Sequence, residues 1–293
     1  MAASDKTVGA AMPQEATEAR QARIIVGLDT SFVAREALSL AARLAASVDA
    51  RLKGVFVEDE NLLTLADLPF AREISFSGET RAMDPARMLR AMKAQAESAR
   101  RILARAAAEA HVDWSFDVRR GRPLTSLAAS AHADDTLVIR SQGAALRDIG
   151  RTVRAATREA RADVLLVSRG TGLRAALSSP VAVSGTLQTV MPGRPVVSID
   201  EGSSIGESCS AFAETLASRL GAPFRRLLAK GRGPADIAAV ARHDGAGLIV
   251  VNADWLGDDD DAAHLSAAAG CPVLLLGSER PPRSAPSPDT QGG

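Results

Sequence analysis

The chain has 293 residues, and 46% of them are hydrophobic, so it can form one large domain or two ordinary ones with buried cores. Its 35 basic and 35 acidic residues cancel, so nothing in the charge balance indicates a general surface for nucleic acid or anionic membranes. No apolar run has the length of a transmembrane helix. Residues 1–21 lack the apolar stretch of a secretory signal, and two cysteines outside any metal or redox spacing favour a reducing, cytoplasmic compartment.

The first ordered stretch is predicted to be a buried strand followed by a capped helix. Residues 23–28 are mostly apolar, and Asp29-Thr30-Ser31 then supplies a helix N-cap. The apolar residues that follow Val33 recur at +4, +7, +11 and +15, which is one stripe of a helix. This is the first half of a βαβ unit, so Asp29 is expected at the carboxyl end of a strand, where parallel sheets bind ligands.

Strand and helix patterns then alternate along the chain. Residues 51–57 are predicted to form a strand, and 61–81 an apolar insert with a short helix and a covering loop. Asp84-Pro85 starts a helix that reaches about Ala110. The next segments are strand 112–118, helix 124–133, strand 135–139, polar loop 141–150, a helix to about 161 and strand 164–167. This order predicts a doubly wound parallel sheet of five strands.

A shorter version of this pattern occurs in the second half of the chain. Residues 195–200 are again an apolar strand that ends in aspartate, and Gly231 is the counterpart of Gly121 in a Gly-Arg turn. Asp29 and Asp200 lie 200 − 29 = 171 residues apart, whereas the two glycines lie 231 − 121 = 110 apart. The second unit therefore lacks about 61 residues, equivalent to one strand, the insert and the long helix. Its four strands are expected to pack on the first unit or on another subunit.

Six short motifs relate the chain to a known family: Ile25-Val-Gly-Leu-Asp29-Thr-Ser, Val55-Phe-Val57-Glu58, Gly121-Arg-Pro, Asp135-Thr-Leu-Val-Ile139, Asp200 and Cys271-Pro-Val-Leu-Leu-Leu276. In this combination the chain resembles the universal stress protein family in a tandem form. The resemblance implies an α/β fold: a doubly wound parallel five-stranded sheet, Rossmann-like and of the adenine nucleotide α-hydrolase type, followed by a second, truncated copy. It also implies dimerisation through the last strand.

The resemblance divides the chain into five parts: a disordered tail at 1–21, a first universal-stress-type α/β domain at 22–168, a linker at 169–194, a truncated second domain of that type at 195–277 and a disordered tail at 278–293. A tandem chain can pair its own two domains as an intramolecular pseudo-dimer, or it can form a homodimer between chains. The sequence leaves both arrangements open.

Many members of the family bind ATP, and these members share three features. They have an aspartate after the first strand, a valine after the second, and a loop of the form Gly-x2-Gly-x9-Gly-Ser/Thr after the fourth. Asp29 and Val57 match the first two features. The glycines of the loop let backbone N–H groups approach phosphate, and its hydroxyl and helix N-terminus hold that phosphate.

The loop of this chain departs from the family pattern. Arg140 replaces the first glycine, six residues rather than nine separate Gly143 from Gly150, and Arg151 precedes Thr152 where a hydroxyl is expected. The arginines add bulk at the phosphate approach, but they also offer cations for an anion. The resemblance places an ATP site, with Mg as the nucleotide's companion, at Asp29, Thr30, Val57, Arg140, Ser141, Gly143, Gly150, Arg151 and Thr152.

Other candidate sites are weaker. In the second unit the acidic run at 257–261 would repel phosphate, so no nucleotide is expected there. Gly170 to Ala175 fits a dinucleotide pattern, but Pro180 would end the following helix early, and we interpret the segment as a linker. The four histidines have no metal-ligand spacing, and no metal site or catalytic residue is predicted.

These patterns predict a cytoplasmic, universal stress protein-like regulatory or binding protein rather than an efficient enzyme, because no general base lies beside the loop. Its predicted ligand is an adenine nucleotide, and neither nucleic acid nor a membrane is an expected partner. Two alternatives stay open: a slow ATP hydrolase that uses Asp29 and the 140–152 loop, and a protein–protein scaffold that works through the insert at 61–81.

Overall fold

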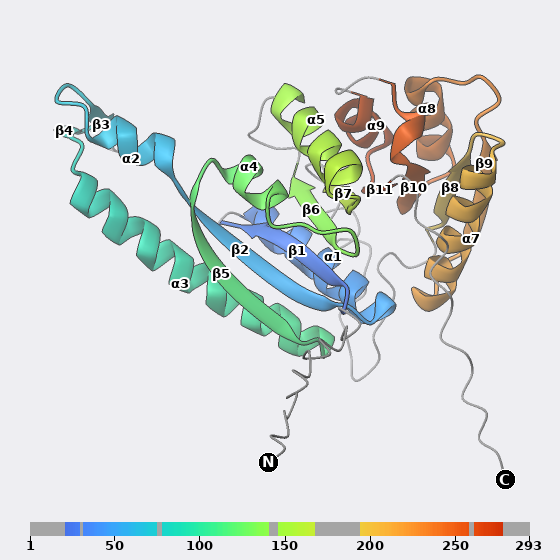
Figure 1. Ribbon diagram of the computed structural model, residues 1–293, viewed down its shortest axis with the longest axis horizontal. Coiled ribbons are helices and arrows are strands. Elements are labelled where there is room, and N and C mark those ends of the chain that lie inside the picture. Colours follow the sequence, from blue (N-terminus) through green and yellow to red (C-terminus); the bar gives the residue numbers. More distant parts are fainter. Residues whose placement is uncertain are drawn as a thin grey trace, which may run out of the picture.

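The computed structural model describes residues 21–29, 32–74, 78–140, 146–167, 194–257 and 261–277. A single nine-stranded sheet runs through the molecule in the order β5-β2-β1-β6-β7-β11-β10-β8-β9, with helices on both faces (Figure 1). Every neighbouring pair in this sheet is parallel except β7 with β11. The predicted fold class, an α/β protein built on a largely parallel sheet, is confirmed.

The strands fall into two runs that meet at β7 and β11. The first run comprises β1 (Arg23–Leu28), β2 (Arg51–Asp59), β5 (Trp114–Gly121), β6 (Thr136–Arg140) and β7 (Asp163–Val167). The second comprises β8 (Val196–Asp200), β9 (Phe224–Leu228), β10 (Leu248–Asn252) and β11 (Val273–Leu276). Every residue of β7, β8 and β10 is buried. Continuous apolar runs of this kind are typical of parallel strands that are covered on both faces.

Seven helices among the described residues cover the sheet. On one face lie α1 (Phe32–Val48), α3 (Pro85–Ala110) and α7 (Ser204–Arg219). On the other lie α4 (Pro123–Ala128), α5 (Leu146–Arg154) with its π-helical continuation η1 (Ala155–Glu159), α8 (Pro234–His243) and α9 (Asp261–Ala269). The short helix α2 (Glu60–Ala66), the hairpin of β3 (Arg72–Ile74) and β4 (Thr80–Ala82), and the turn η2 (Ala253–Trp255) complete the description.

The antiparallel pair β7–β11 joins the two runs of strands. Leu165 lies opposite Leu274, and the carboxylate of Asp163 accepts a hydrogen bond from the N–H of Gly277, with Oδ1 and N 3.0 Å apart. A Cβ on Gly277 would lie 2.9 Å from the carbonyl oxygen of Ala162, so only glycine allows the chain to pass here. Both hydrophobic clusters contain residues from the two runs, so each core continues across this junction.

The second run differs from the first by one strand. β9 pairs directly with β8, whereas in the first run β2 lies between β1 and β5. Gly121 and Gly231, matched in the sequence, both have positive φ, at 147° and 76°. At Gly121 a Cβ would also lie 2.6 Å from Oγ of Ser126, so glycine is required at this turn. The second run therefore has one strand fewer than the first, and its origin as a truncated copy stays a prediction.

Several predicted boundaries are wrong. The helix expected after residue 150 begins at Leu146, so Gly150 lies inside α5 and not in a loop. The third predicted strand runs from Trp114 to Gly121 rather than over 112–118. The insert contains the predicted short helix, α2, but its other part is the hairpin of β3 and β4 rather than a covering loop.

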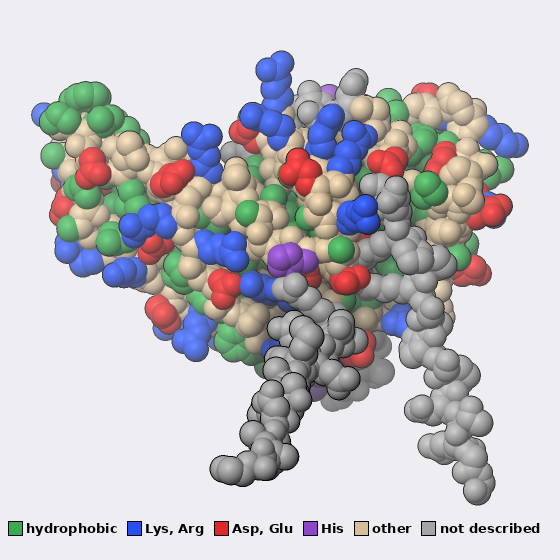
Figure 2. Space-filling view, in the orientation of Figure 1, with side chains coloured by type: hydrophobic (Ala, Val, Ile, Leu, Met, Phe, Trp, Pro, Cys, Tyr) green, Lys and Arg blue, Asp and Glu red, His purple; other side chains and the backbone are tan. Residues whose placement is uncertain are grey.

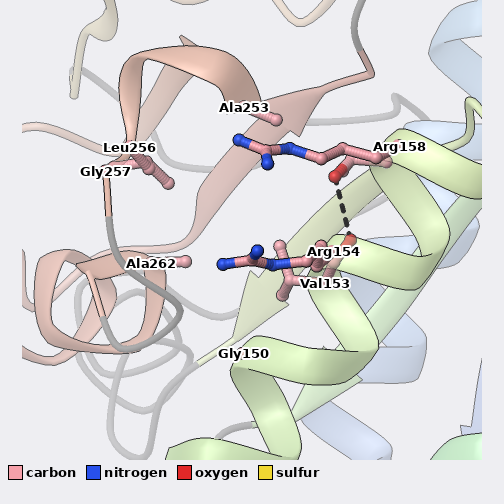
Figure 3. A pocket seen from close by; sticks show the side chains of 9 residues that line it. Gly150, Val153, Arg154, Arg158, Ala253, Leu256, Gly257 and Ala262 are labelled. Carbon is pink, nitrogen blue, oxygen red and sulfur yellow. Dashed lines mark hydrogen bonds between the residues drawn. The ribbon is translucent and has the colours of Figure 1, made fainter.

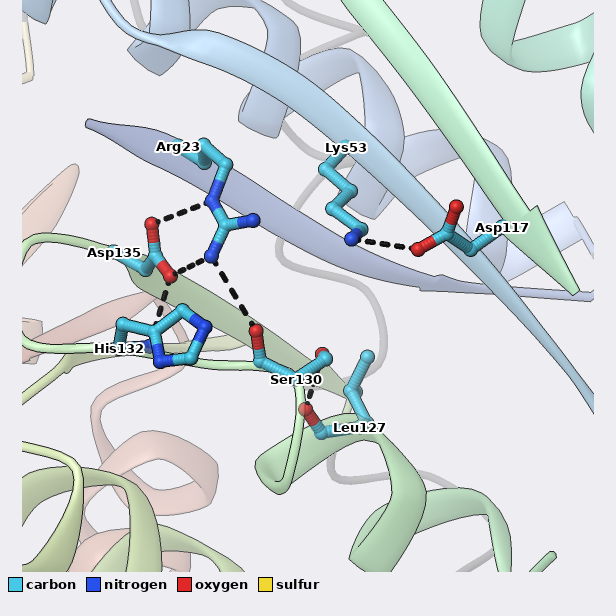
Figure 4. A network of polar contacts seen from close by, with 7 residues as sticks. All are labelled: Arg23, Lys53, Asp117, Leu127, Ser130, His132 and Asp135. Atoms are coloured by element: carbon cyan, nitrogen blue, oxygen red, sulfur yellow. Dashed lines mark hydrogen bonds and ion pairs between the residues drawn. The ribbon is translucent and has the colours of Figure 1, made fainter. Parts of the chain in front are cut away.

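A buried ion pair ties the starts of β1 and β6 together (Figure 4). Asp135 is 2% exposed, and its two oxygens accept hydrogen bonds from Nε and Nη2 of Arg23 at 2.9 and 2.5 Å. The N–H of His132 donates to the same carboxylate at 2.8 Å. With all its partners in place, the pair fixes the register of two central strands.

Asp135→Ala is expected to lower the free energy of unfolding by about 3–5 kcal/mol, because it leaves the Arg23 guanidinium unpaired in a largely buried position. Asp148→Ala is the matched control. The Arg151–Asp148 pair is nearly as short, at 2.7 Å, but both side chains are exposed, at 71% and 52%, so its loss is expected to cost about 1 kcal/mol or less. Urea unfolding of both variants measures this difference, and equal small losses would contradict the buried-pair interpretation.

Both cysteines are expected to be unreactive in the folded protein. Burial raises the pKa of Cys209 and of Cys271 to about 12, so very little thiolate forms near neutral pH. Titration with Ellman's reagent at about pH 8 is expected to detect no fast-reacting thiol in native protein and both thiols in guanidinium chloride. Fast reaction of either thiol without denaturant would show that the core around it opens.

Candidate functional site

The strand order reverses between β1 and β6. From β1 the chain passes to β2 and β5 on one side, and it then returns to β6 and β7 on the other side. In open parallel sheets, ligands bind outside the carboxyl ends of the strands at such a switch point. The residues that follow β1 and those that end β6 therefore form the candidate site.

Asp29 and Arg140 meet at this switch point. Asp29 comes directly after β1, and Arg140 is the last residue of β6. Nη2 of Arg140 lies 2.5 Å from Oδ2 of Asp29. The carboxylate remains 47% exposed and the arginine 21% exposed. Two adjacent strands that end at the same edge thus bring an accessible ion pair together across the crevice.

The start of α1 adds a second feature suited to an anion. The helix begins at Phe32, three residues after Asp29, and its first turn contains no acidic residue. The first N–H groups of a helix have no partner within the helix, and the helix dipole makes this end partly positive. Together with Arg140, this end of the sheet can hold a negatively charged group such as a phosphate.

The other predicted site residues lie in different positions. Val57 is in β2, half-buried, and packs against the core on the face covered by α4 and α5. Thr30, Ser141 and Gly143 lie outside the described residues. The structure therefore brings together two of the nine predicted residues, Asp29 and Arg140, in a direct contact.

The three residues that the family pattern places at the end of a phosphate-binding loop lie instead inside a helix. Gly150, Arg151 and Thr152 lie in the middle of α5. Arg151 pairs with Asp148 one turn earlier at 2.7 Å, and the Thr152 hydroxyl donates to the carbonyl of Asp148 at 2.6 Å. Backbone N–H groups in a helix interior bond to carbonyls of the preceding turn, so these three residues have no free N–H groups for a phosphate.

The second run of strands has a similar pair at its own switch point, between β8 and β10. Asp200 ends β8, and its Oδ2 accepts a hydrogen bond from Nε of Arg226 in β9 at 2.5 Å. Its other oxygen accepts from the N–H of Gly202 at 2.7 Å. The side chain is 0% exposed, and Gly206 of α7 packs so closely that a Cβ there would lie 2.6 Å from Oδ1. A ligand can reach this carboxylate only by displacing α7 or the side chain of Arg226.

The environment of Asp200 favours its charged form. Burial raises the pKa of Asp200, but the hydrogen bonds from Gly202 and Arg226 and the charge of Arg226 outweigh it, so the pKa is lower than usual. Sequence reasoning missed Arg226. The sequence shows only that an arginine lies on the strand that follows an aspartate-ended strand. The pairing can be recognised only when β8 and β9 are known to be neighbours in the sheet.

A pocket lies between the two runs of strands (Figure 3). It has a volume of about 320 Å³, including space open to solvent, and is lined by Gly150, Val153, Arg154, Thr157, Arg158, Ala253, Leu256, Gly257 and Ala262. Arg154 and Arg158 point from α5 and η1 toward the segment after β10, where Arg158 pairs with Asp254 at 3.7 Å. These contacts make the pocket part of the junction between the two runs.

Within the described residues, no group of three or more His, Cys, Asp or Glu side chains is arranged to hold a metal ion. Among the same residues, no helix has the length and apolar character needed to cross a membrane.

Solved structures relate this fold to known proteins. The structure aligns with a universal stress protein from Archaeoglobus fulgidus over 87% of this chain and 96% of that chain, at 11% identity and a TM-score of 0.54. The chain has the universal stress protein fold. An alignment of this extent includes strands from both runs of the sheet, and not only the first five.

Two shorter matches each cover 50% of this chain. One is a universal stress protein family member from Burkholderia pseudomallei, with 25% identity, 94% of that chain covered and a TM-score of 0.33. The other is a universal stress protein in complex with cAMP, with 19% identity, 97% of that chain covered and a TM-score of 0.34. No protein-family model matches the sequence, and no curated protein matches it either.

In this universal stress protein fold, Asp200→Asn is expected to lower the free energy of unfolding at neutral pH. The folded-state pKa of Asp200 is lowered. The stability that its charged form adds is therefore complete above the unfolded-state pKa of about 3.9, and it is lost as the pH falls through the folded-state pKa. Urea unfolding at several pH values is expected to show a gap between wild type and variant that narrows below about pH 4.

The exposed Glu214 of α7 gives the control for this pH series. Glu214→Gln is expected to follow wild type at every pH, because the side chain lies on the solvent side of the helix. A gap between Asp200→Asn and wild type that stays constant down to pH 3 would contradict the role given to the charge of Asp200.

Proposed function

We propose that this protein is a universal stress protein-like binding protein that regulates a stress response by binding an adenine nucleotide at the carboxyl ends of β1 and β6. The observation that supports this most directly is the accessible Asp29–Arg140 ion pair across the first switch point. The second switch point supports the assignment by contrast, because Asp200 is sealed there and serves the fold.

The phosphates and the ribose of a nucleotide can each bind one member of the Asp29–Arg140 pair. Arg140 and the start of α1 offer positive charge to the phosphates. Asp29 is a hydrogen-bond acceptor for hydroxyl groups of the ribose, the role that carboxylates at this edge have in related sheets. Val57 offers an apolar side chain at the neighbouring strand.

Without ligand, Arg140 neutralises Asp29, which would otherwise repel phosphate from this edge. Phosphate oxygens then compete with the carboxylate for the guanidinium, and Asp29 becomes available to the sugar as they do so. The arginine that replaces the first glycine of the family loop is in this proposal a ligand-binding residue and not an obstruction.

We propose binding rather than turnover. Hydrolysis needs a general base beside the phosphates. In this proposal Asp29 accepts hydrogen bonds from the ribose hydroxyls, so it does not activate a water beside the phosphates. Mg is proposed only as the companion of ATP.

The two runs of strands correspond, in this proposal, to a first unit at 22–168 and a truncated second unit at 195–277. Their pairing through β7 and β11 is proposed to be an intramolecular version of the contact through which members of this family dimerise. The second unit then acts as a packing partner with no nucleotide of its own. We propose a cytoplasmic location for the whole chain.

Thermal unfolding with and without excess Mg·ATP tests the nucleotide site. A ligand that binds only the folded state adds about 2.7 kcal/mol of stability at one hundred times its dissociation constant, so the melting temperature is expected to rise by several degrees. AMP, cAMP and GTP measured in parallel define the nucleotide. Arg140→Ala and Asp29→Asn are expected to lose the rise.

Asp117→Asn is the matched control for these variants. Asp117 is as exposed as Asp29, at 43% against 47%, and it is also paired with a basic residue, but it lies on β5 away from the switch point. The control is expected to keep the full rise. No shift with any adenine nucleotide at millimolar concentration, or a shift that both Arg140→Ala and Asp29→Asn retain, would overturn the proposed site.

A further inference from the structure

A projecting arm extends from one end of the sheet (Figure 1). We use the name arm for α2 and the β3–β4 hairpin, residues 60–74 and 78–82. The arm follows β2 directly, and α3 leads back from it to the sheet. The buried residues of α3 begin at Met92, so the first turns of this helix project with the arm beyond the sheet.

The arm has an unusually apolar surface. Eight large hydrophobic side chains are exposed among the described residues, and five of them lie on the arm: Leu62 at 43%, Leu65 at 44%, Leu68 at 38%, Phe70 at 76% and Ile74 at 74%. Figure 2 shows apolar side chains gathered at the tip of this projection. At about 170–200 Å² for each fully exposed side chain, the five present roughly 500 Å² of apolar surface, as much as the largest patch on a typical monomer.

The arm is held in shape by polar contacts along its length. The carboxylate of Glu73 in β3 forms ion pairs with Arg81 of β4 and with Arg87 of α3. The side chains of Asp59 and Asp84 cap α2 and α3, each accepting from a backbone N–H at 2.9 Å. A two-stranded hairpin has little stability of its own in water, so these contacts keep its apolar side chains on a defined surface.

A second copy of this chain is the occupant that fits best. The other exposed hydrophobic residues in the described part of the chain are Val118, on the edge strand β5, and the separate Ile205 and Leu228 of the second run. The described part of the body therefore offers no apolar patch that matches the arm, whereas another arm does. The strands β7 and β11, through which the family dimerises, are already paired with each other.

The charged residues of the arm are compatible with a second copy of the chain as its partner. The arm carries four acidic residues and two basic ones, Arg72 and Arg81. It lacks the basic surplus that would draw it to a nucleic acid or an anionic membrane. With both signs present, two arms can meet without strong repulsion.

We infer that two copies of the protein associate through their arms about a two-fold axis, with the apolar side chains of one arm packed against those of the other. The two patches together bring roughly 1,000 Å² of apolar surface, which reaches the lower limit of a specific interface before the flanking polar atoms are added. A two-fold contact of this kind uses the same patch on both partners and is closed. The inference does not depend on the nucleotide site.

Multi-angle light scattering across micromolar concentrations tests the arm contact. Wild-type protein is expected to approach twice the chain mass of 30.5 kDa as its concentration rises. Phe70→Glu combined with Ile74→Glu should remain a monomer, because it places charges in the centre of the contact. Ile205→Glu combined with Leu228→Glu, a matched pair of exposed positions in the second run, should dimerise like wild type.

A single-cysteine variant tests the contact without adding charge. Both native thiols are buried, so in Phe70→Cys the new thiol is the accessible one among the described residues. Mild oxidation is expected to link two Phe70→Cys chains into a covalent dimer, whereas Ile205→Cys should stay monomeric. Wild-type protein that remains a monomer, a dimer that survives Phe70→Glu/Ile74→Glu, or equal cross-linking of both cysteine variants would overturn the inference.

Discussion

The antiparallel pairing of β7 with β11 is the contact on which the rest of the architecture depends. A run of four parallel strands is too thin to bury a core of its own, and each open sheet has two edges with unpaired backbone groups. Pairing β7 with β11 removes one edge from each run and merges the cores on both faces. The hydrogen bond from Gly277 to Asp163 holds the end of this contact, and the lack of a side chain at Gly277 lets the two segments approach.

Asp29 and Asp200 show how two similarly placed aspartates can differ in what surrounds them. Both lie at the carboxyl end of a parallel strand, and both are paired with an arginine. Arg140 comes from the strand across the switch point, so the first pair spans the crevice and stays accessible. Arg226 comes from the strand on the other side, and α7 closes over the second carboxylate. Strand order, rather than the residue itself, separates a candidate ligand site from a structural pair.

The sequence predicted what depends on local pattern. Apolar runs located the central strands to within a residue or two, and the Asp84-Pro85 start of α3 is confirmed by its cap. The start of α5 was missed because polar Arg147 and Asp148 resemble a loop, although Ile149 and Val153 already have the i, i+4 spacing of a buried stripe. The Asp29–Arg140 and Asp200–Arg226 pairs could not be predicted, because they join strands whose neighbours no local pattern reveals.

The two ends of the sheet differ because, among the described residues, the insert and α3 belong to the first run alone. They place the arm beside β5. The second run ends in β9, a short strand on which Arg225 and Arg226 are exposed and paired with Asp244 and Asp200. Charged residues on a short edge strand discourage pairing with another chain. The sheet therefore has an apolar arm at one end and a charged edge strand at the other. Association through the arm alone produces a closed pair, whereas contacts at both ends would allow an open filament.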